Sequence, residues 1–250
     1  MSKGPTPWPD TEYTTGIANT MPSKTGLIIP LDVDTREEAL RIVDQCGNVP
    51  GYKVGFQLFT RTGPDFVREL KNSGHFVFLD LKLHDIPNTV QYGAASAADL
   101  GADLTTVHAL GGKKMIAAAR MAVEGTPTRI LAVTILTSHS DEVLKSDLGL
   151  DETAAQAVPR LAGLAVEAGA HGLVASPVEI GLIREKVGAK PIIVTPGVRP
   201  SWAGADDQAR VLTPAEAARA GSDYVVIGRP IIKHPNPAKA VQLILEELSE

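Results

Sequence analysis

The chain has 250 residues, of which 44% are hydrophobic and 21% are charged, as in ordinary globular proteins. Its 24 basic and 29 acidic residues give a formal net charge of −5 without a basic stripe, so nucleic acid is not an expected partner. A single cysteine, Cys46, excludes an internal disulfide and favours a reducing, cytoplasmic location, and we expect neither a membrane span nor a signal peptide.

Residues 1–24 differ in composition from the rest of the chain. They contain three prolines before residue 10, together with many Ser, Thr and Gly residues, and show no helical or strand period. We expect an N-terminal extension that is extended or poorly ordered and that packs late, if at all. The predicted folded domain therefore covers residues 25–250.

From residue 25 onward, apolar, β-branched runs alternate with helical patterns rich in Ala and charged residues. Eight segments have the character of strands: Gly26–Asp32, Gly51–Gly55, His75–Lys82, Leu104–His108, Ile130–Leu136, Gly172–Ala175, Pro191–Thr195 and Tyr224–Ile227. Eight segments have helical character: 35–46, 63–72, 89–100, 112–123, 153–168, 177–187, 213–220 and 237–248. This alternation indicates a parallel sheet, and eight units in about 225 residues match a closed (β/α)8 barrel.

An open, doubly wound sheet is the structural alternative. It would require a glycine fingerprint after the first strand, where this chain has Pro30-Leu31-Asp32-Val33-Asp34 instead. We therefore predict an α/β protein with a single TIM barrel. In that barrel, the long connection from Thr137 to Leu150 is a candidate flap.

The run of residues 77–89 carries charges where a purely structural strand would carry Val or Ile. Asp80 and Lys82 lie two residues apart in an otherwise apolar strand, so they are expected to point to the same face. Asp85 follows just before a turn into a helix. Because an unpaired buried charge costs several kcal/mol or more, these residues indicate a functional site.

Active sites of such barrels lie at the C-terminal ends of the strands, so polar residues at those ends are candidates. Asp32, Lys53, Asp80 and Lys82 are expected to form a cluster of alternating charge. Further polar candidates at strand ends are Asp85, His108, Thr137, Ser138, Arg199 and Arg229.

The loops after the seventh and eighth strands have the composition of a phosphate site. Gly197 and Gly228 would let backbone N–H groups approach an anion, and Arg199 and Arg229 would supply forked donors. Barrels of this class commonly bind phosphate at these two loops.

With these motifs in place, the chain resembles the orotidine 5′-monophosphate decarboxylases. Residues 80–89, DLKLHDIPNT, are similar to the signature of that family. Other similar segments follow in the family's order: Leu31-Asp32, Lys53-Val54-Gly55, Val107-His108-Ala109, Leu136-Thr137-Ser138, Thr195-Pro196-Gly197-Val198-Arg199-Pro200, Asp207-Gln208 and Ile227-Gly228-Arg229-Pro230. The resemblance covers about residues 25–248 and excludes the extension.

The resemblance implies decarboxylation of orotidine 5′-monophosphate to uridine 5′-monophosphate (UMP) and CO₂, the last step of de novo UMP synthesis, without a metal or an organic cofactor. By position, Lys82 would protonate C6 of the pyrimidine and Asp80 would lie against the substrate carboxylate. Lys53 and Asp85 would complete the charged network. The remaining substrate-binding positions would be Asp32 at the ribose, Thr137 at the base, Pro196, and Arg199, Gln208, Gly228 and Arg229 at the phosphate.

The resemblance also implies a homodimer, with Asp85, Ile86 and Thr89 entering the neighbouring site. The physical chemistry agrees with the implied activity, because an ammonium group beside C6 would stabilise the carbanion and then supply a proton. Binding energy from the distant phosphate would offset crowding at the reacting carbon.

Three alternatives remain at the level of sequence. Asp80 and Lys82 alone would also suit a structural ion pair, although the other convergent groups favour a site. Related metal-dependent decarboxylases and aldolases of sugar phosphates carry a similar Asp-x-Lys-x-x-Asp strand. A non-catalytic sensor of phosphate ligands is the third alternative. The segment 87–89, Lys53 and Gln208 favour the nucleotide enzyme, whereas His108 is expected to be a packing residue and His84 to face outward.

Overall fold

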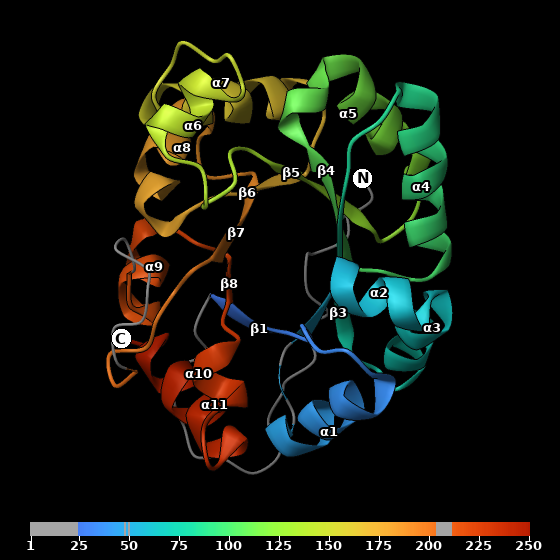
Figure 1. The fold of residues 1–250 in the computed structure, drawn as a ribbon, viewed down its shortest axis with the longest axis vertical. Coiled ribbons are helices and arrows are strands. Elements are labelled where there is room, and N and C mark those ends of the chain that lie inside the picture. The colour runs from blue at the N-terminus through green and yellow to red at the C-terminus, as the bar shows by residue number, and fades with distance from the viewer. Residues whose placement is uncertain (1–24, 48, 50, 204–211) are drawn as a thin grey trace, which may run out of the picture.

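Eight parallel strands pair in sequence order, and the sheet closes through pairing of the first strand with the eighth. The computed structural model describes residues 25–47, 49, 51–203 and 212–250, and Figure 1 shows the strands around a central axis. The strands are β1 (Gly26–Pro30), β2 (Gly51–Gly55), β3 (Phe76–Leu83), β4 (Leu104–His108), β5 (Arg129–Val133), β6 (Gly172–Val174), β7 (Ile192–Pro196) and β8 (Tyr224–Val226). The predicted (β/α)8 TIM barrel is therefore confirmed. The N-terminal extension and Gln208 lie outside the described residues.

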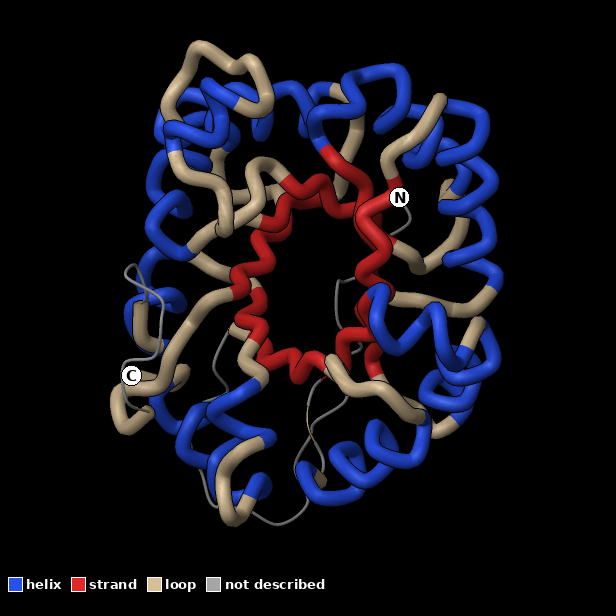
Figure 2. Tube along the Cα trace, in the orientation of Figure 1, coloured by secondary structure: helices blue, strands red, loops and turns tan. Residues whose placement is uncertain are grey.

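The helices form a ring outside the strands (Figure 2). They are α1 (Arg36–Cys46), α2 (Phe56–Thr62), α3 (Pro64–Asn72), α4 (Pro87–Asp99), α5 (Gly112–Ala122), α6 (Asp141–Ser146), α7 (Ala154–Glu167), α8 (Ile180–Val187), α9 (Pro214–Ala220), α10 (Arg229–Ile232) and α11 (Pro237–Glu247), with 3₁₀ turns at Ala109–Gly111 and Pro177–Glu179. Each of the eight predicted helical segments has a counterpart. No helix within the described ranges is long and apolar enough to cross a membrane.

Three short helices were not predicted, and one of them, α6, lies within the candidate flap. The strand β5 ends at Val133, not at Leu136, and the connection that follows contains α6. The Ser140 hydroxyl caps this helix by accepting the backbone N–H of Val143. Asp141 and Glu142 then lie in its first turn, where carboxylates interact favourably with the helix dipole. The other two, α2 and α10, each have seven residues or fewer, too short for a clear period.

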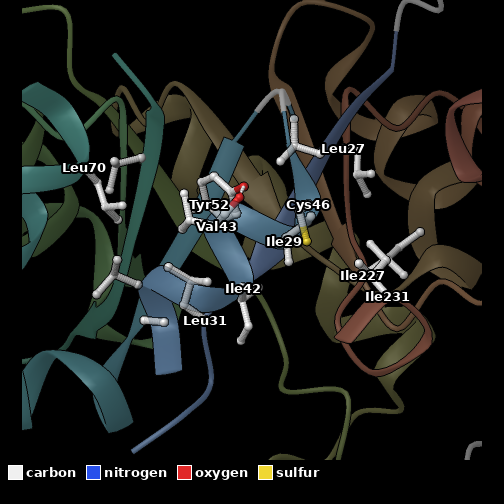
Figure 3. Close-up of a cluster of buried hydrophobic side chains, with 14 of the residues drawn as sticks. Leu27, Ile29, Leu31, Ile42, Val43, Cys46, Tyr52, Leu70, Ile227 and Ile231 are labelled. Carbon is white, nitrogen blue, oxygen red and sulfur yellow. Dashed lines mark hydrogen bonds between the residues drawn. The ribbon is translucent and has the colours of Figure 1, made fainter. Parts of the chain in front are cut away.

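Alternation along the strands divides the core into an inner and an outer layer. The inner layer fills the barrel with buried side chains from seven strands: Ile28, Phe78, Leu104, Leu131, Val133, Val174, Val194, Tyr224 and Val226. The outer layer packs the strands on the helices, as Figure 3 shows for Leu27 and Ile29 of β1 near Val43 and Cys46 of α1. Burial raises the pKa of the Cys46 thiol to about 11, so it stays protonated and packs as a small core residue.

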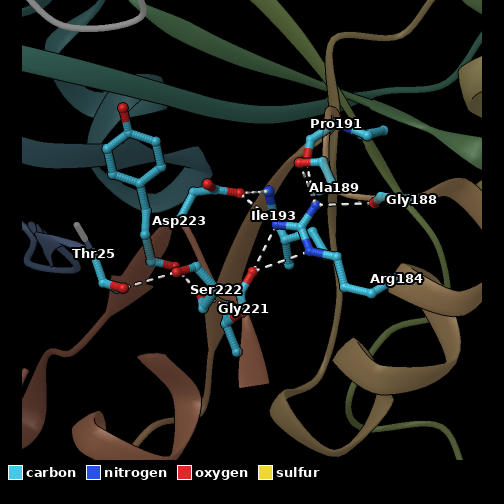
Figure 4. Close-up of polar contacts among 11 residues, drawn as sticks. Thr25, Arg184, Gly188, Ala189, Pro191, Ile193, Gly221, Ser222 and Asp223 are labelled. Atoms are coloured by element: carbon cyan, nitrogen blue, oxygen red, sulfur yellow. Dashed lines mark hydrogen bonds and ion pairs between the residues drawn. The ribbon is translucent and has the colours of Figure 1, made fainter. Parts of the chain in front are cut away.

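The N-terminal end of the barrel is closed by hydrogen-bonded charges. Asp223, just before β8, accepts the backbone N–H of Ile193 and a bond from the Arg184 guanidinium, each at 2.7 Å (Figure 4). The same guanidinium also donates to backbone carbonyls of four residues: Gly188, Ala189, Pro191 and Gly221. Asp103, just before β4, repeats the arrangement by accepting from Lys71 and from the N–H of Val77. These contacts tie helices to strands at the end opposite the candidate site.

Candidate active site

Four residues at the C-terminal ends of β1, β2 and β3 form one chain of alternating charge. The Lys53 ammonium lies 2.9 Å from Asp32 Oδ1 and 3.7 Å from Asp80 Oδ2. The Lys82 ammonium lies 2.8 Å from the same Asp80 oxygen. The structure thus brings together the four residues that the sequence grouped. The Asp80 side chain is only 10% exposed, so its two lysine partners are needed to offset its desolvation.

The strand β3 is not regular where it carries these charges. Leu79 pairs with Thr105 of β4 and Leu83 pairs with Val107, so three residues of β3 lie opposite one residue of β4. In this bulge Lys82 has φ 46°, the single non-glycine residue in the described ranges with positive φ. Such a conformation costs on the order of 1–3 kcal/mol and persists where surrounding contacts hold it. A regular strand was expected here from the sequence, so this distortion was not predicted.

Thr106, which sequence analysis missed, is the β4 residue opposite the bulge. Its side chain is fully buried. The hydroxyl accepts the backbone N–H of Lys82 at 2.8 Å and donates to Asp80 Oδ1 at 2.9 Å. A polar residue two positions before His108 in an apolar strand was the available signal, because the two residues share a strand face.

Gly55 lies beside the Lys53 ammonium at the end of β2. A Cβ atom at this position would be 2.8 Å from Lys53 Nζ and 3.5 Å from Asp32 Oδ1. Glycine therefore leaves room for the ion pair between Lys53 and Asp32.

A cavity of about 190 Å³ opens beside the charge chain at the end of the barrel. One part of its wall is charged and the rest is mainly apolar. The lining residues are Lys53, Phe78, Asp80, Lys82, Val133, Ile135, Leu136, Thr137, Val174, Ala175, Pro196 and Val226. Five of the predicted site residues thus line the cavity: Lys53, Asp80, Lys82, Thr137 and Pro196. Asp32 lies beside them because it is bound to Lys53.

A larger, open hollow of about 550 Å³ lies outside the barrel between α1, α2 and α3. Four of its charged side chains are already paired with one another, in the Arg36–Glu69 and Arg61–Asp34 ion pairs. The strand-end cavity is therefore the better candidate, because its lysines and aspartates converge on an enclosed space.

The two predicted phosphate loops have different local structures. Gly197 has φ 79°, a conformation that favours glycine, and Arg199 nearby is only 9% exposed. Gly228 has negative φ, but a Cβ atom there would lie 2.7 Å from Pro30 Cγ, so packing also requires glycine. Arg229 is exposed and begins α10.

Asp85, Ile86 and Thr89 lie apart from the charge chain within this protomer. All three are exposed at the start of α4, and the Ile86 side chain is 66% exposed. Asp85 Oδ1 accepts the N–H of Ile86 at 2.6 Å, and Asp85 forms no ion pair with another described residue. Its carboxylate is exposed at the surface.

His108 lies at the end of β4, close to the charge chain. Its ring stacks on that of His84, with centroids 5.3 Å apart. Burial, together with the neighbouring His84, His139 and Lys82, lowers the pKa of His108 to about 4. His108 is therefore neutral near pH 7, as suits a packing residue, and His84 is exposed as expected. Among the described residues, no group of three or more His, Cys, Asp and Glu side chains is placed to hold a metal ion.

Comparison with known proteins places this chain in a family. The family model described as "Orotidine 5'-phosphate decarboxylase / HUMPS family" matches residues 25–244. An orotidine 5′-phosphate decarboxylase of Syntrophotalea carbinolica is 51% identical over 231 residues, which cover 89% of this chain and 94% of the relative. The enzyme of the same name from Geobacter metallireducens is 55% identical over 202 residues, covering 79% of this chain and 84% of the relative.

A solved structure agrees with the sequence comparisons. The crystal structure of orotidine 5′-phosphate decarboxylase from Lactobacillus acidophilus superposes with a TM-score of 0.81 at 39% identity, covering 90% of this chain and 99% of that one. Residues 25–244, which the family model matches, contain all eight strands of the barrel and the four residues of the charge chain. This chain belongs to the orotidine 5′-phosphate decarboxylase / HUMPS family.

Proposed function

We propose that this protein decarboxylates orotidine 5′-monophosphate to UMP and CO₂, the last step of de novo UMP synthesis. The observation that carries the proposal is the chain of alternating charge from Asp32 to Lys82, which opens on the strand-end cavity. Two relatives that share about half of their residues with this chain are named orotidine 5′-phosphate decarboxylase, and these names support the proposed substrate.

Lys82 is the proposed proton donor. When the bond from C6 to the carboxylate breaks, its electron pair stays on C6 and CO₂ leaves. The Lys82 ammonium stabilises this negative charge and transfers a proton to C6, and the resulting amine regains a proton from solvent. Asp80, bound to Lys82 at 2.8 Å, orients the ammonium and lies against the substrate carboxylate.

The other site residues are proposed to bind the remainder of the nucleotide. Asp32 binds the ribose hydroxyls, Lys53 completes the charged network, and Thr137 contacts the base. The phosphate group is bound by side chains and backbone of the two glycine-containing loops: Pro196, Arg199, Gln208, Gly228 and Arg229. Phosphate binding energy is then available to hold the pyrimidine against Asp80.

A substrate comparison tests this proposal. Purified protein is given orotidine 5′-monophosphate, or a keto-sugar phosphate, with chelator and separately with Mg²⁺. We expect loss of the pyrimidine absorbance in both buffers and no reaction of the sugar phosphate. Two results would contradict the assignment. One is turnover of the sugar phosphate but not of orotidine 5′-monophosphate, and the other is turnover that requires Mg²⁺.

We also propose a homodimer in which Asp85, Ile86 and Thr89 complete the neighbouring site. Their exposure at the start of α4 and the absence of an ion pair for Asp85 among described residues support this arrangement. Asp85 would there join Lys82 and add a second carboxylate to the charged network.

Hybrid dimers test the shared site. An Asp85→Ala subunit mixed with a Lys82→Ala subunit leaves one site that contains both a native Lys82 and the partner's native Asp85. We expect about half of the wild-type rate per hybrid dimer, from that one intact site, and little activity from either homodimer. A verified hybrid no more active than the homodimers would show that Asp85 acts within its own protomer or not at all.

A further inference from the structure

The bulge in β3 leaves the Lys82 backbone N–H and the Asp80 carboxylate without a backbone partner on β4. A side chain of β4 forms hydrogen bonds with both groups instead. Residues 80–82 lie between Leu79 and Leu83, which pair with β4. Thr106 is the one residue of β4 that lies opposite these three residues. Its hydroxyl accepts the Lys82 backbone N–H and donates to Asp80 Oδ1. The Thr106 hydroxyl oxygen is therefore hydrogen-bonded both to the backbone of Lys82 and to the carboxylate of Asp80.

The hydrogen bond from Thr106 fixes the orientation of the Asp80 carboxylate. With Oδ1 held by Thr106, Oδ2 points to Lys82 Nζ at 2.8 Å and to Lys53 Nζ at 3.7 Å. The same hydroxyl replaces the ladder hydrogen bond that the bulge breaks, and so supports the left-handed backbone of Lys82. A hydroxyl can accept and donate at once through one atom, whereas the equally sized side chain of Val can do neither.

We propose that Thr106 is a positioning residue for decarboxylation, acting through Asp80 and Lys82. The inference rests on the proposed function and extends it to a residue buried behind the reacting groups. Thr106 does not line the cavity, so it does not contact the substrate. Its loss is expected to affect the chemical step more than nucleotide binding, because the binding groups at the ribose and phosphate are unchanged.

Thr105 offers a matched control in the neighbouring position. It is the same residue type and is also fully buried, but its hydroxyl has no hydrogen-bond partner among the described residues. Replacing each threonine by valine removes one hydroxyl and preserves the side-chain shape, so only Thr106→Val removes hydrogen bonds.

The experiment measures kcat, KM and thermal midpoint for wild type, Thr106→Val, Thr106→Ser and Thr105→Val, with UMP binding as a check of the folded site. We expect kcat of Thr106→Val to fall about 10- to 100-fold, because it loses a hydrogen bond to a charged group and leaves a buried N–H unpaired. KM should change less than about threefold, Thr106→Ser should recover most of the rate, and Thr105→Val should retain it. If Thr106→Val does not fold, Thr106→Ala takes its place with the same expectation.

Three results would overturn the positioning role: a Thr106→Val rate within about twofold of wild type, an equal loss in Thr105→Val, or no recovery in Thr106→Ser. Failure of the proposed function gives a different result, because wild-type protein would then not convert orotidine 5′-monophosphate. Active wild-type protein with unchanged Thr106→Val would remove the inference and leave the proposed function intact.

Discussion

Aspartates bind cations at both ends of the barrel, but their other partners differ. At the N-terminal end, Asp103 and Asp223 each accept a backbone N–H of the neighbouring strand and a bond from a cation on a helix. At the C-terminal end, Asp80 binds the Thr106 hydroxyl and faces two lysines that extend from strands. The first arrangement connects secondary structure, whereas the second concentrates charge at a cavity.

The cations show the difference most clearly. At the N-terminal end, the Arg184 guanidinium donates to Asp223 and to four backbone carbonyl groups, so the protein itself uses its donors. Among the described residues, the Lys82 ammonium has one hydrogen bond, to Asp80. An ammonium has three donors, so Lys82 retains capacity for a ligand. The charged groups at the N-terminal end are therefore bonded within the protein, whereas Lys82 at the C-terminal end has donors left for a ligand.

Replacing Lys82 by Ala should have the largest effect on activity. We expect kcat to fall by at least about 10³-fold, because both the stabilising charge and the proton donor are lost. UMP binding, measured by calorimetry, should remain close to wild type. The thermal midpoint should also change little, because Lys53 and Thr106 still contact the Asp80 carboxylate. Near-normal turnover would contradict the role of Lys82 as proton donor, and a collapse of the thermal midpoint would erase the contrast between the two ends.

Replacing Arg184 by Ala should have the opposite pattern. Loss of its bonds to Asp223 and the carbonyls is expected to destabilise the fold by about 2–3 kcal/mol, less than for a fully buried pair because Asp223 is partly exposed. The thermal midpoint should then fall by about 5–10 °C while kcat at 25 °C is unchanged. The exposed Arg68–Asp65 pair is the control, and Arg68→Ala should change stability by less than about 1 kcal/mol. A loss of kcat in folded Arg184→Ala would show that the two ends are coupled.

Replacing Gly55 by Ala should disturb the C-terminal end more gently. The added Cβ would crowd Lys53 Nζ, so the lysine must move relative to Asp32. We expect kcat/KM to fall about 3- to 10-fold without a comparable change in thermal midpoint. A Cβ atom added at Gly181 on α8 would enter open space among the described residues, so Gly181→Ala is the matched control and should be neutral. Equal activity of the two variants would show that the Lys53–Asp32 distance is not critical.

The smallest expected effect concerns His171 at the N-terminal end of the barrel. This residue is expected to make the stability of the fold sensitive to acid. Its Nδ1 accepts the backbone N–H of Ile130, and burial, with Arg120 and Arg129 nearby, lowers its pKa to about 4. Because the folded state favours neutral imidazole, this stabilisation is fully present above the unfolded pKa near 6.5 and is lost as pH falls toward 4.

The thermal midpoint from pH 7 to 4.5 tests this linkage. His171→Asn, whose side-chain oxygen can accept the same N–H, should lose about 2–4 °C less over this range than wild type. His108, with a pKa also lowered to about 4, would account for part of the remaining slope. Parallel curves for variant and wild type would exclude His171 as a source of the acid sensitivity.

Much of the fold was accessible from the sequence because its signals are local. Alternating strand and helix patterns predict the barrel, and the apolar strand with Asp80 and Lys82 indicates the site. The short helix α6 was also marked, by Ser140 followed by two acidic residues, although the sequence analysis assigned that region to a loop.

Other features depend on contacts between distant segments. The left-handed conformation of Lys82 is held by Thr106, 24 residues away, and no pattern within β3 reveals it. The requirement for glycine at position 228 comes from Pro30, which is far away along the chain. The role proposed for Asp85 requires a second protomer, which no pattern in one chain can reveal, and Gln208 lies outside the described residues.

We propose that the chain of charge from Asp32 to Lys82 supports decarboxylation without help from a metal. The most direct test quantifies both UMP and CO₂ formed from orotidine 5′-monophosphate by the wild-type protein in excess chelator. We predict equimolar UMP and CO₂ at a rate that chelator does not change. Absence of UMP, or a rate that returns only when a divalent cation is added back, would contradict the account.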